Sequence, residues 1–180
     1  MSTEFRCKLL ALAAALLGLC LAPGPAMVFA YPTGAAGPQS NTYHDPQGRY
    51  TLTVADGWTA KADDSGSAQL RSGASWATLL AGTGSDATGV NHGILQQIQS
   101  QYQDFRVLNE GNLQVNGHPA HGSNATGINR QGARVSLLVI SISAGSGHFL
   151  TVVSSTPNEQ AREVNAAVMQ MTQSIRFSGE

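Results

Sequence analysis

The chain has 180 residues, of which 12% are charged and 42% are hydrophobic, and its formal net charge is −1 at pH 7. Nucleic-acid binding requires a concentrated basic face, and this near-neutral chain with scattered charges argues against a nucleic acid as partner. Its two cysteines, Cys7 and Cys20, lie within the first thirty residues. A chain that lost this segment would have no thiol for disulfides, thiolate catalysis or metal binding.

The first thirty residues have the layout of an export signal. Two basic residues precede an apolar run from Leu9 to Ala22, and Ala30 closes a small-residue cleavage pattern. The run is shorter than the roughly 20 residues that a bilayer-spanning helix needs, so we expect cleavage, with retention as a membrane anchor as the alternative. Cys20 follows a leucine rather than a small residue, which argues against a lipid anchor there. The sequence therefore predicts a signal peptide over residues 1–30, a secreted or periplasmic product, and no integral membrane span after cleavage.

Residues 31–40 form a predicted flexible linker, and residues 41–180 are enough for a single domain with its own core. In chain order, alternating apolar and polar residues predict strands over about 49–54, from Trp58, and over about 68–71, 75–81, 105–115, 118–128, 133–143 and 148–155. Apolar residues at three- and four-residue spacing predict helices over about 91–102 and from Pro157.

The run Val135–Ile142 is apolar on both faces, which is typical of a central strand in a sheet that is covered on both sides. Short connections, among them the hairpin-forming Asn116–Gly117, make the pairing antiparallel. Two amphipathic helices separated by four strands can provide the cover, one on each face. The sequence therefore predicts an α+β fold: a three-layer α/β/α sandwich with a central, mostly antiparallel sheet.

The opening of this domain resembles the PsbP-like family, which includes exported bacterial and DcrB-like proteins. Residues 48–58, Gly-Arg-Tyr-Thr-Leu-Thr-Val-Ala-Asp-Gly-Trp, are similar to the family's opening strand and its proline, glycine, tryptophan turn, with Ala55 in the usual place of proline. The likeness extends from Thr42 to Phe177 and includes the closing Ser-Ile-Arg-Phe at 174–177. The resemblance implies an antiparallel sheet between helices and an exported assembly or accessory protein that is usually not an enzyme. It implies no binding residue. We interpret Trp58 as a core anchor that closes the turn, with ligand stacking as the alternative.

Histidines and an aspartate raise the possibility of a metal site: His44, Asp45, His118, His121 and His148. Residues three apart on a strand point to opposite faces, so His118 and His121 cannot converge unless Pro119 introduces a bulge. The predicted hairpins place His121 opposite Ser141 and His148 two strands away, about 10 Å by strand spacing. A zinc ion needs ligand atoms at about 2 Å. We therefore expect solvated histidines and no metal site.

Residues 82–87, Gly-Thr-Gly-Ser-Asp-Ala, fit the alanine variant of the dinucleotide fingerprint, with Asp104 about 20 residues further on. The fingerprint works inside a parallel βαβ unit, whereas the connections predicted here are hairpins. We therefore expect a flexible loop in which Ser85, Asp86 or Thr88 caps the next helix.

Other polar residues give weaker signals. Ser75 lacks the last glycine of a nucleophile elbow and begins a strand. Asp63 and Asp64 are adjacent in a polar turn, where we expect them to be solvated, although a glycosidase would need two carboxyls facing one cleft. Asn124 begins a glycosylation sequon, which only a host with that machinery would use.

Taken together, these patterns favour a non-enzymatic extracytoplasmic binding or assembly module with a protein partner, which it contacts through the loop Gly82–Gly89 or a sheet edge. The alternative is a small secreted hydrolase or metal-binding protein with an unrecognised site, for which His118, His121, Asp63 and Asp64 are the candidates. We assign no catalytic, cofactor-binding or metal-binding residue and expect no cofactor.

Overall fold

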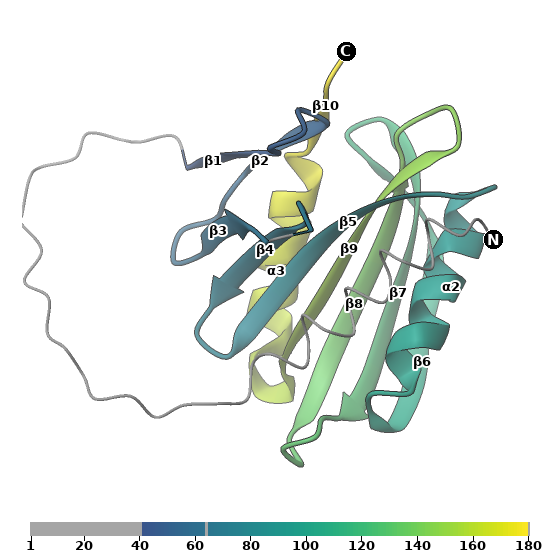
Figure 1. Ribbon diagram of the computed structural model, residues 1–180. Coiled ribbons are helices and arrows are strands. Elements are labelled where there is room, and N and C mark those ends of the chain that lie inside the picture. The colour runs from purple at the N-terminus through teal and green to yellow at the C-terminus, as the bar shows by residue number, and fades with distance from the viewer. Residues whose placement is uncertain (1–40, 64, 180) are drawn as a thin grey trace, which may run out of the picture. The chain divides into compact units, whose positions relative to one another are not determined.

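The computed structural model describes residues 41–63 and 65–179; the predicted signal peptide and linker lie outside the described residues (Figure 1). The described strands and helices, in chain order, are β1 (Thr42–His44), β2 (Tyr50–Thr53), β3 (Thr59–Ala62), β4 (Ala68–Ser72), β5 (Ser75–Thr83), α2 (Ala87–Gln99), β6 (Gln103–Val115), β7 (His118–Ile128), β8 (Arg134–Ser143), β9 (His148–Pro157), the 3-10 helix η1 (Asn158–Gln160), α3 (Ala161–Gln173) and β10 (Arg176–Phe177). Among the described residues, no helix has the length and apolar character needed to span a bilayer.

The larger sheet has seven strands in the order β3-β4-β5-β9-β8-β7-β6, and every neighbouring pair is antiparallel. The predicted hairpin at Asn116–Gly117 is confirmed: both residues have positive φ, 49° and 85°, as a primed two-residue turn requires. This turn fixes the register of β6 on β7 and places Asn112 opposite His121. The next hairpin places His121 opposite Ser141, as predicted.

Each helix covers one face of the larger sheet (Figure 1). Ser123 and Val139 are cross-strand neighbours on the face against which α2 packs, where the Asn91 side chain bonds to both. Strand residues alternate between faces, so Leu138 lies on the opposite face, and it shares a core cluster with Val168 of α3. The structure confirms the predicted three-layer sandwich with a central antiparallel sheet.

The strand predicted over 49–54 is observed as β2, but it belongs to a separate three-stranded sheet with the order β1-β2-β10. In that sheet β10 brings the end of the chain back beside β2, with Phe177 opposite Tyr50. The side chains of Tyr50, Leu52 and Val54 join the core on the α3 side. Trp58 belongs to the same core and is only 6% exposed, in agreement with its interpretation as an anchor.

Helix α2 begins at Ala87, about one turn earlier than the apolar spacing predicted. The reason is its N-cap: Asp86 Oδ1 accepts a hydrogen bond of 2.8 Å from the backbone N–H of Gly89. This bond lowers the pKa of the exposed Asp86 carboxyl. The loop thus supplies a cap that adds one turn to the start of the helix. This added turn contains Thr88 and comes just before His92.

Candidate functional site

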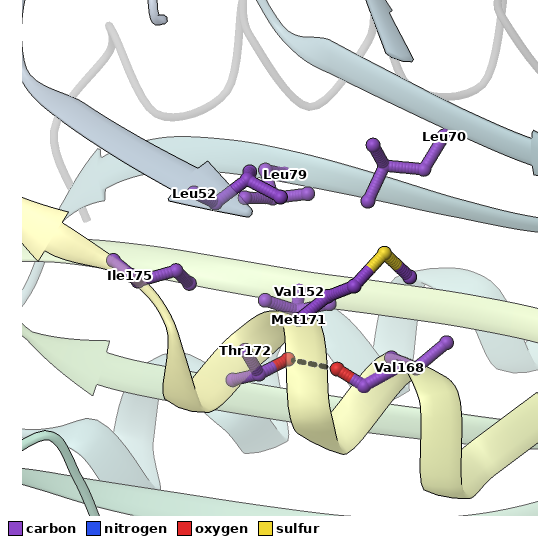
Figure 2. A pocket seen from close by; sticks show the side chains of 8 residues that line it. All are labelled: Leu52, Leu70, Leu79, Val152, Val168, Met171, Thr172 and Ile175. Atoms are coloured by element: carbon purple, nitrogen blue, oxygen red, sulfur yellow. Dashed lines mark hydrogen bonds between the residues drawn. The ribbon is translucent and has the colours of Figure 1, made fainter. Parts of the chain in front are cut away.

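A small cavity lies in the core between the larger sheet, β2 and α3. Its lining residues, drawn in Figure 2, are Leu52, Leu70, Leu79, Val152, Val168, Met171, Thr172 and Ile175. Its volume is about 10 Å³, and a space of that size holds about one water molecule. The Thr172 hydroxyl, the polar side-chain group in the lining, already donates to the Val168 carbonyl at 2.7 Å. The cavity is a packing gap in the core and is too small to admit a ligand.

A polar cluster lies under α2, near the edge of the larger sheet where β6 and β7 pair. It consists of His92 on α2, Glu110 on β6 and His121 on β7, and we call it the His–Glu cluster. One ligand atom from each of the three residues lies within 4.8 Å of the others. His92 Nε2 and Glu110 Oε2 are 3.1 Å apart, and the His92 and His121 rings meet edge to face at 5.8 Å between centroids. Two imidazoles and a carboxylate therefore converge from three elements.

Helix spacing and hairpin register together build this cluster. Thr88 and His92 are four residues apart on α2 and so lie on the same side of the helix. On the sheet, Asn112 is paired with His121, and Glu110 is paired with Ser123. Cross-strand partners share a face, as do residues two apart on a strand, so these four side chains all point to the face that α2 covers. The His–Glu cluster forms where these two patterns meet.

The His121 ring is buried and is held from one side. Its Nδ1 atom lies 2.9 Å from Oδ1 of Asn112 and 3.2 Å from Oγ1 of Thr88. A carboxamide oxygen only accepts hydrogen bonds, so Nδ1 is the donor in the contact with Asn112. In the neutral tautomer with its proton on Nδ1, Nε2 carries the lone pair. This Nε2 atom is buried, and among the described residues it has no hydrogen-bond partner.

Asn91, the neighbour of His92, fixes α2 on the sheet at this point. Its side chain is fully buried; Nδ2 donates to the carbonyls of His121 and Val139, both at 3.1 Å, and Oδ1 accepts from Ser123 Oγ at 2.7 Å. All of the principal hydrogen-bonding capacity of this amide is used, and a satisfied buried network holds its members in one geometry. Asn91 therefore sets the position of His92 relative to His121.

The structure does not bring together the other predicted metal candidates. The regular register of β7 confirms that His118 and His121 lie on opposite faces, and His118 contacts the Ser143 carbonyl and the Phe177 ring. His44 and His148 are exposed, on β1 and β9. His121, by contrast, is buried, and the expectation of solvated histidines was wrong for this residue because α2 covers it.

Asp45 is also buried, as the partner of Arg49 in an ion pair of 2.6 Å. Burial by itself would raise the pKa of Asp45, but hydrogen bonds from Arg49 outweigh it and hold that pKa below the usual range. Asp63 organises the turn between β3 and β4 by accepting hydrogen bonds from Ser65 and Ser67. It follows β3, which is separated from β7 by β4, β5, β9 and β8, and Asp64 lies outside the described residues.

The glycine-containing loop is not a dinucleotide site. Strand β5 pairs antiparallel with β4 and β9, and β6, the strand that follows α2, lies at the edge of the sheet with β9, β8 and β7 between it and β5, so the loop does not join two adjacent parallel strands as the dinucleotide fold requires. Gly84 donates to the carbonyl of Gly147 at 3.0 Å, and a Cβ at Gly84 would lie 2.3 Å from Val90. This glycine allows the loop to pack against α2. Ser75 is buried and bonded to Thr156, with no exposed hydroxyl for nucleophilic chemistry.

Comparison with solved structures identifies the fold. The solution structure of cyanobacterial PsbP (CyanoP) from Synechocystis sp. PCC 6803 superposes with a TM-score of 0.60 at 13% identity, covering 82% of this chain and 99% of that one. The Saccharomyces cerevisiae Ran-binding protein Mog1p superposes with a TM-score of 0.58 at 11% identity, and the match covers 76% of this chain and 94% of Mog1p. LpqN of Mycobacterium tuberculosis, which is involved in cell envelope biogenesis, superposes with a TM-score of 0.57 at 13% identity, and the match covers 77% of this chain and 90% of LpqN.

The chain has the Mog1p/PsbP-like fold. No family model and no curated protein sequence matches it. At 11 to 13% identity the likeness is one of fold. The resemblance stated from the opening strand and turn is confirmed at that level.

Sequence reasoning missed two members of the His–Glu cluster, His92 and Glu110. The signal for Glu110 was present, because the turn at Asn116–Gly117 fixes which residues of β6 share a face with His121. His92 gave no comparable signal. Its position depends on how α2 docks, and that is set by the buried amide of Asn91.

Proposed function

We propose that the chain is an exported, non-enzymatic binding or accessory module that acts through an extracytoplasmic protein partner. The observation that carries this proposal is a pair of exposed apolar side chains on an edge strand of the larger sheet. Strand β6 is the last strand of the larger sheet, and Val107 and Leu108 on it are 44% and 63% exposed. They are the large hydrophobic residues that the described part of the chain leaves exposed.

The local backbone makes this edge suited to a partner. The register of β6 on β7 shifts between Val107 and Asn109, so Leu108 is a bulged residue without a partner on β7. Bulges redirect side chains at sheet edges. Among the described residues, no strand pairs with the outer edge of β6, and the backbone N–H and C=O groups of such an edge can pair with an extended segment of another protein that adds a strand. We therefore take the partner to be a protein that supplies such a segment, with an apolar side chain against Leu108.

The structural neighbours support a binding role. Mog1p is a Ran-binding protein, and LpqN is involved in cell envelope biogenesis. Export rests on the signal-like segment over residues 1–30. Its test is the amino terminus of the secreted protein, which should be Tyr31, with an intact mass that corresponds to a chain without cysteine; a chain that retains Met1 and Cys20 would contradict it.

Site-specific photocrosslinking tests the binding surface. A photoactivatable residue would replace Leu108 on one edge of the sheet or, as the matched control, the exposed Ala62 on the opposite edge strand β3. We expect a discrete crosslinked protein from position 108 and none from position 62 in the cell that exports the chain. In a chain without the photoactivatable residue, we expect Leu108→Asp to abolish capture of that protein. The melting temperature of this variant should be unchanged because Leu108 is exposed. Equal crosslinking from both positions, or full capture by Leu108→Asp, would contradict the proposal.

A further inference from the structure

We propose that His92, Glu110 and His121 bind one divalent transition-metal ion of the zinc class. This inference goes beyond the proposed protein partner and is independent of it. The three side chains already place their ligand atoms within 4.8 Å of one another. Two imidazole nitrogens and one carboxylate oxygen are a ligand set that zinc uses in proteins, with a fourth position left for water or another ligand.

The observation that carries the proposal is the buried, unpartnered Nε2 atom of His121. An exposed ion pair would account for His92 and Glu110, whose side chains are 46% and 45% exposed. It would leave His121 unexplained, because a buried imidazole lone pair without a donor is costly. Among the described residues no donor reaches this atom, and a ring nitrogen of His121 lies within 4.8 Å of a ligand atom of His92 and of Glu110, close enough for a shared ion. A metal ion satisfies all three groups at once.

The surroundings of His121 are those of a prepared ligand. Metal-binding histidines commonly donate a hydrogen bond from the second ring nitrogen, which fixes the tautomer and the orientation of the ring. Here Nδ1 lies 2.9 Å from Asn112 Oδ1, and Thr88 Oγ1 lies near the same nitrogen at 3.2 Å. Asn112 and Thr88 thus keep Nε2 directed away from themselves and available as a ligand atom.

The remaining geometry requires only small side-chain movements. Metal–ligand bonds of about 2.0 to 2.1 Å in a tetrahedron put the ligand atoms about 3.4 Å apart. His92 Nε2 and Glu110 Oε2 are at 3.1 Å, close to this spacing. The buried His121 is fixed, while the two half-exposed side chains can move toward it. The network of Asn91 holds the backbone of α2 against β7 while they do so.

The chemistry of the ligands selects the class of ion. Imidazole nitrogen favours zinc, copper and nickel, whereas magnesium and calcium prefer sites made of oxygen ligands. We therefore expect Zn²⁺ to bind one per chain and Mg²⁺ not to compete. Because the three ligands come from α2, β6 and β7, bound metal should also slow backbone hydrogen exchange in α2 and β6.

Zinc titration of the chain from Tyr31 to Glu180, which contains every described residue, tests the proposal. The variants His92→Ala and Glu110→Gln change half-exposed side chains and should remain folded. We expect each to weaken zinc binding at least about tenfold. The matched control is His148→Ala, an exposed histidine on β9, which should bind zinc as the unchanged chain does. Absence of saturable binding, or unchanged affinity in His92→Ala and Glu110→Gln, would overturn the proposal, as would equal competition by Mg²⁺.

Because His121 is buried, its substitution can disturb folding, and a spectroscopic test of the unchanged chain avoids this. Long-range ¹H–¹⁵N spectra of the histidine rings should show His121 protonated on Nδ1 before zinc is added. Addition of one equivalent of Zn²⁺ should shift the Nε2 signals of His92 and His121 and leave that of His148 in place. Shifts at His148 with none at His121 would overturn the assignment. The Leu108→Asp variant should bind zinc normally, so failure of the metal site and failure of the partner surface can be told apart.

Discussion

Asp45 and Arg49 form a two-point ion pair in which Nε and Nη2 of Arg49 donate hydrogen bonds of 2.7 and 2.6 Å to Oδ2 and Oδ1 of Asp45. The same Nη2 donates at 3.0 Å to the carbonyl of Gly66. Arg49 thus connects the turn between β1 and β2 to the turn between β3 and β4, which belong to different sheets. The carboxylate of Asp45 is buried and would be costly without this partner.

Substitution of Asp45 by Asn should therefore lower the free energy of unfolding by about 1.5 to 3 kcal/mol at pH 7, as expected for hydrogen bonds to a charged group. The folded-state pKa of Asp45 is below its unfolded value of about 3.9. Its contribution is therefore complete above the unfolded pKa and is lost as the pH falls through the folded pKa. Urea denaturation should show the same difference in the free energy of unfolding between the unchanged chain and Asp45→Asn at pH 7 and at pH 5. This difference should be smaller at pH 3.

The control for this experiment is Asp56→Asn, which removes an exposed carboxylate from the next turn. Its effect should stay within about 0.5 kcal/mol at each pH. A gap for Asp45→Asn that widens as the pH falls would contradict the sign derived from the lowered pKa.

The two tryptophans provide a second, matched comparison. Trp58 is 6% exposed and belongs to the core on the α3 side, whereas Trp76 on β5 is only partly buried. Trp58→Ala should lower the free energy of unfolding by about 3 to 5 kcal/mol, because it leaves a large cavity in a packed core. Trp76→Ala should cost distinctly less. Thermal unfolding followed by circular dichroism measures both, and an equal effect of the two substitutions would contradict the anchor interpretation of Trp58.

The larger sheet could be predicted because its signals are local. The run Val135–Ile142 is apolar on both faces, and Asn116–Gly117 favours one kind of turn, so a covered antiparallel sheet follows from short stretches of sequence. The three-stranded sheet could not be predicted in the same way. Strands β1 and β10 have three and two residues, which are too few to show a period. In addition, the pairing of β10 with β2 depends on how α3 returns the chain.

The His–Glu cluster was hidden for a related reason. Its residues come from a helix and two strands, and nothing in their sequence spacing joins His92 to His121. The position of α2 is set partly by Asn91, a polar residue where an amphipathic pattern predicts an apolar one. A buried amide with three well-placed partners depends on the tertiary structure. The register of the hairpin therefore predicts that Glu110 and His121 share a face, whereas the position of His92 depends on how the helix docks.

That role of Asn91 leads to a third prediction. Asn91→Ala should lower the free energy of unfolding by about 2 to 4 kcal/mol, because it removes hydrogen bonds to two buried carbonyls and leaves Ser123 without its acceptor. Ser123→Ala should cost about 1 kcal/mol, since it removes only one of those bonds. The double variant should cost less than the sum of the two, because both substitutions remove the same interaction. Urea denaturation of the four chains gives the coupling, and strict additivity would contradict a shared network.

The fourth prediction concerns Gly84, which lies in the segment that fits the dinucleotide fingerprint. A Cβ built there would lie 2.3 Å from Cγ2 of Val90 and within 3.7 Å of the Phe149 ring. Valine cannot move this methyl group without leaving its preferred rotamer, so Gly84→Ala should lower the free energy of unfolding by about 1 to 3 kcal/mol through overpacking. Val90→Ala removes the clashing methyl group, and the double variant Gly84→Ala, Val90→Ala should therefore be more stable than the sum of the two single effects. Gly93→Ala is the control, because a Cβ there meets no atom within 4 Å and the helix should gain stability. Thermal melts of these chains decide between packing and a ligand-binding role: a stable Gly84→Ala chain would contradict the packing explanation for this glycine.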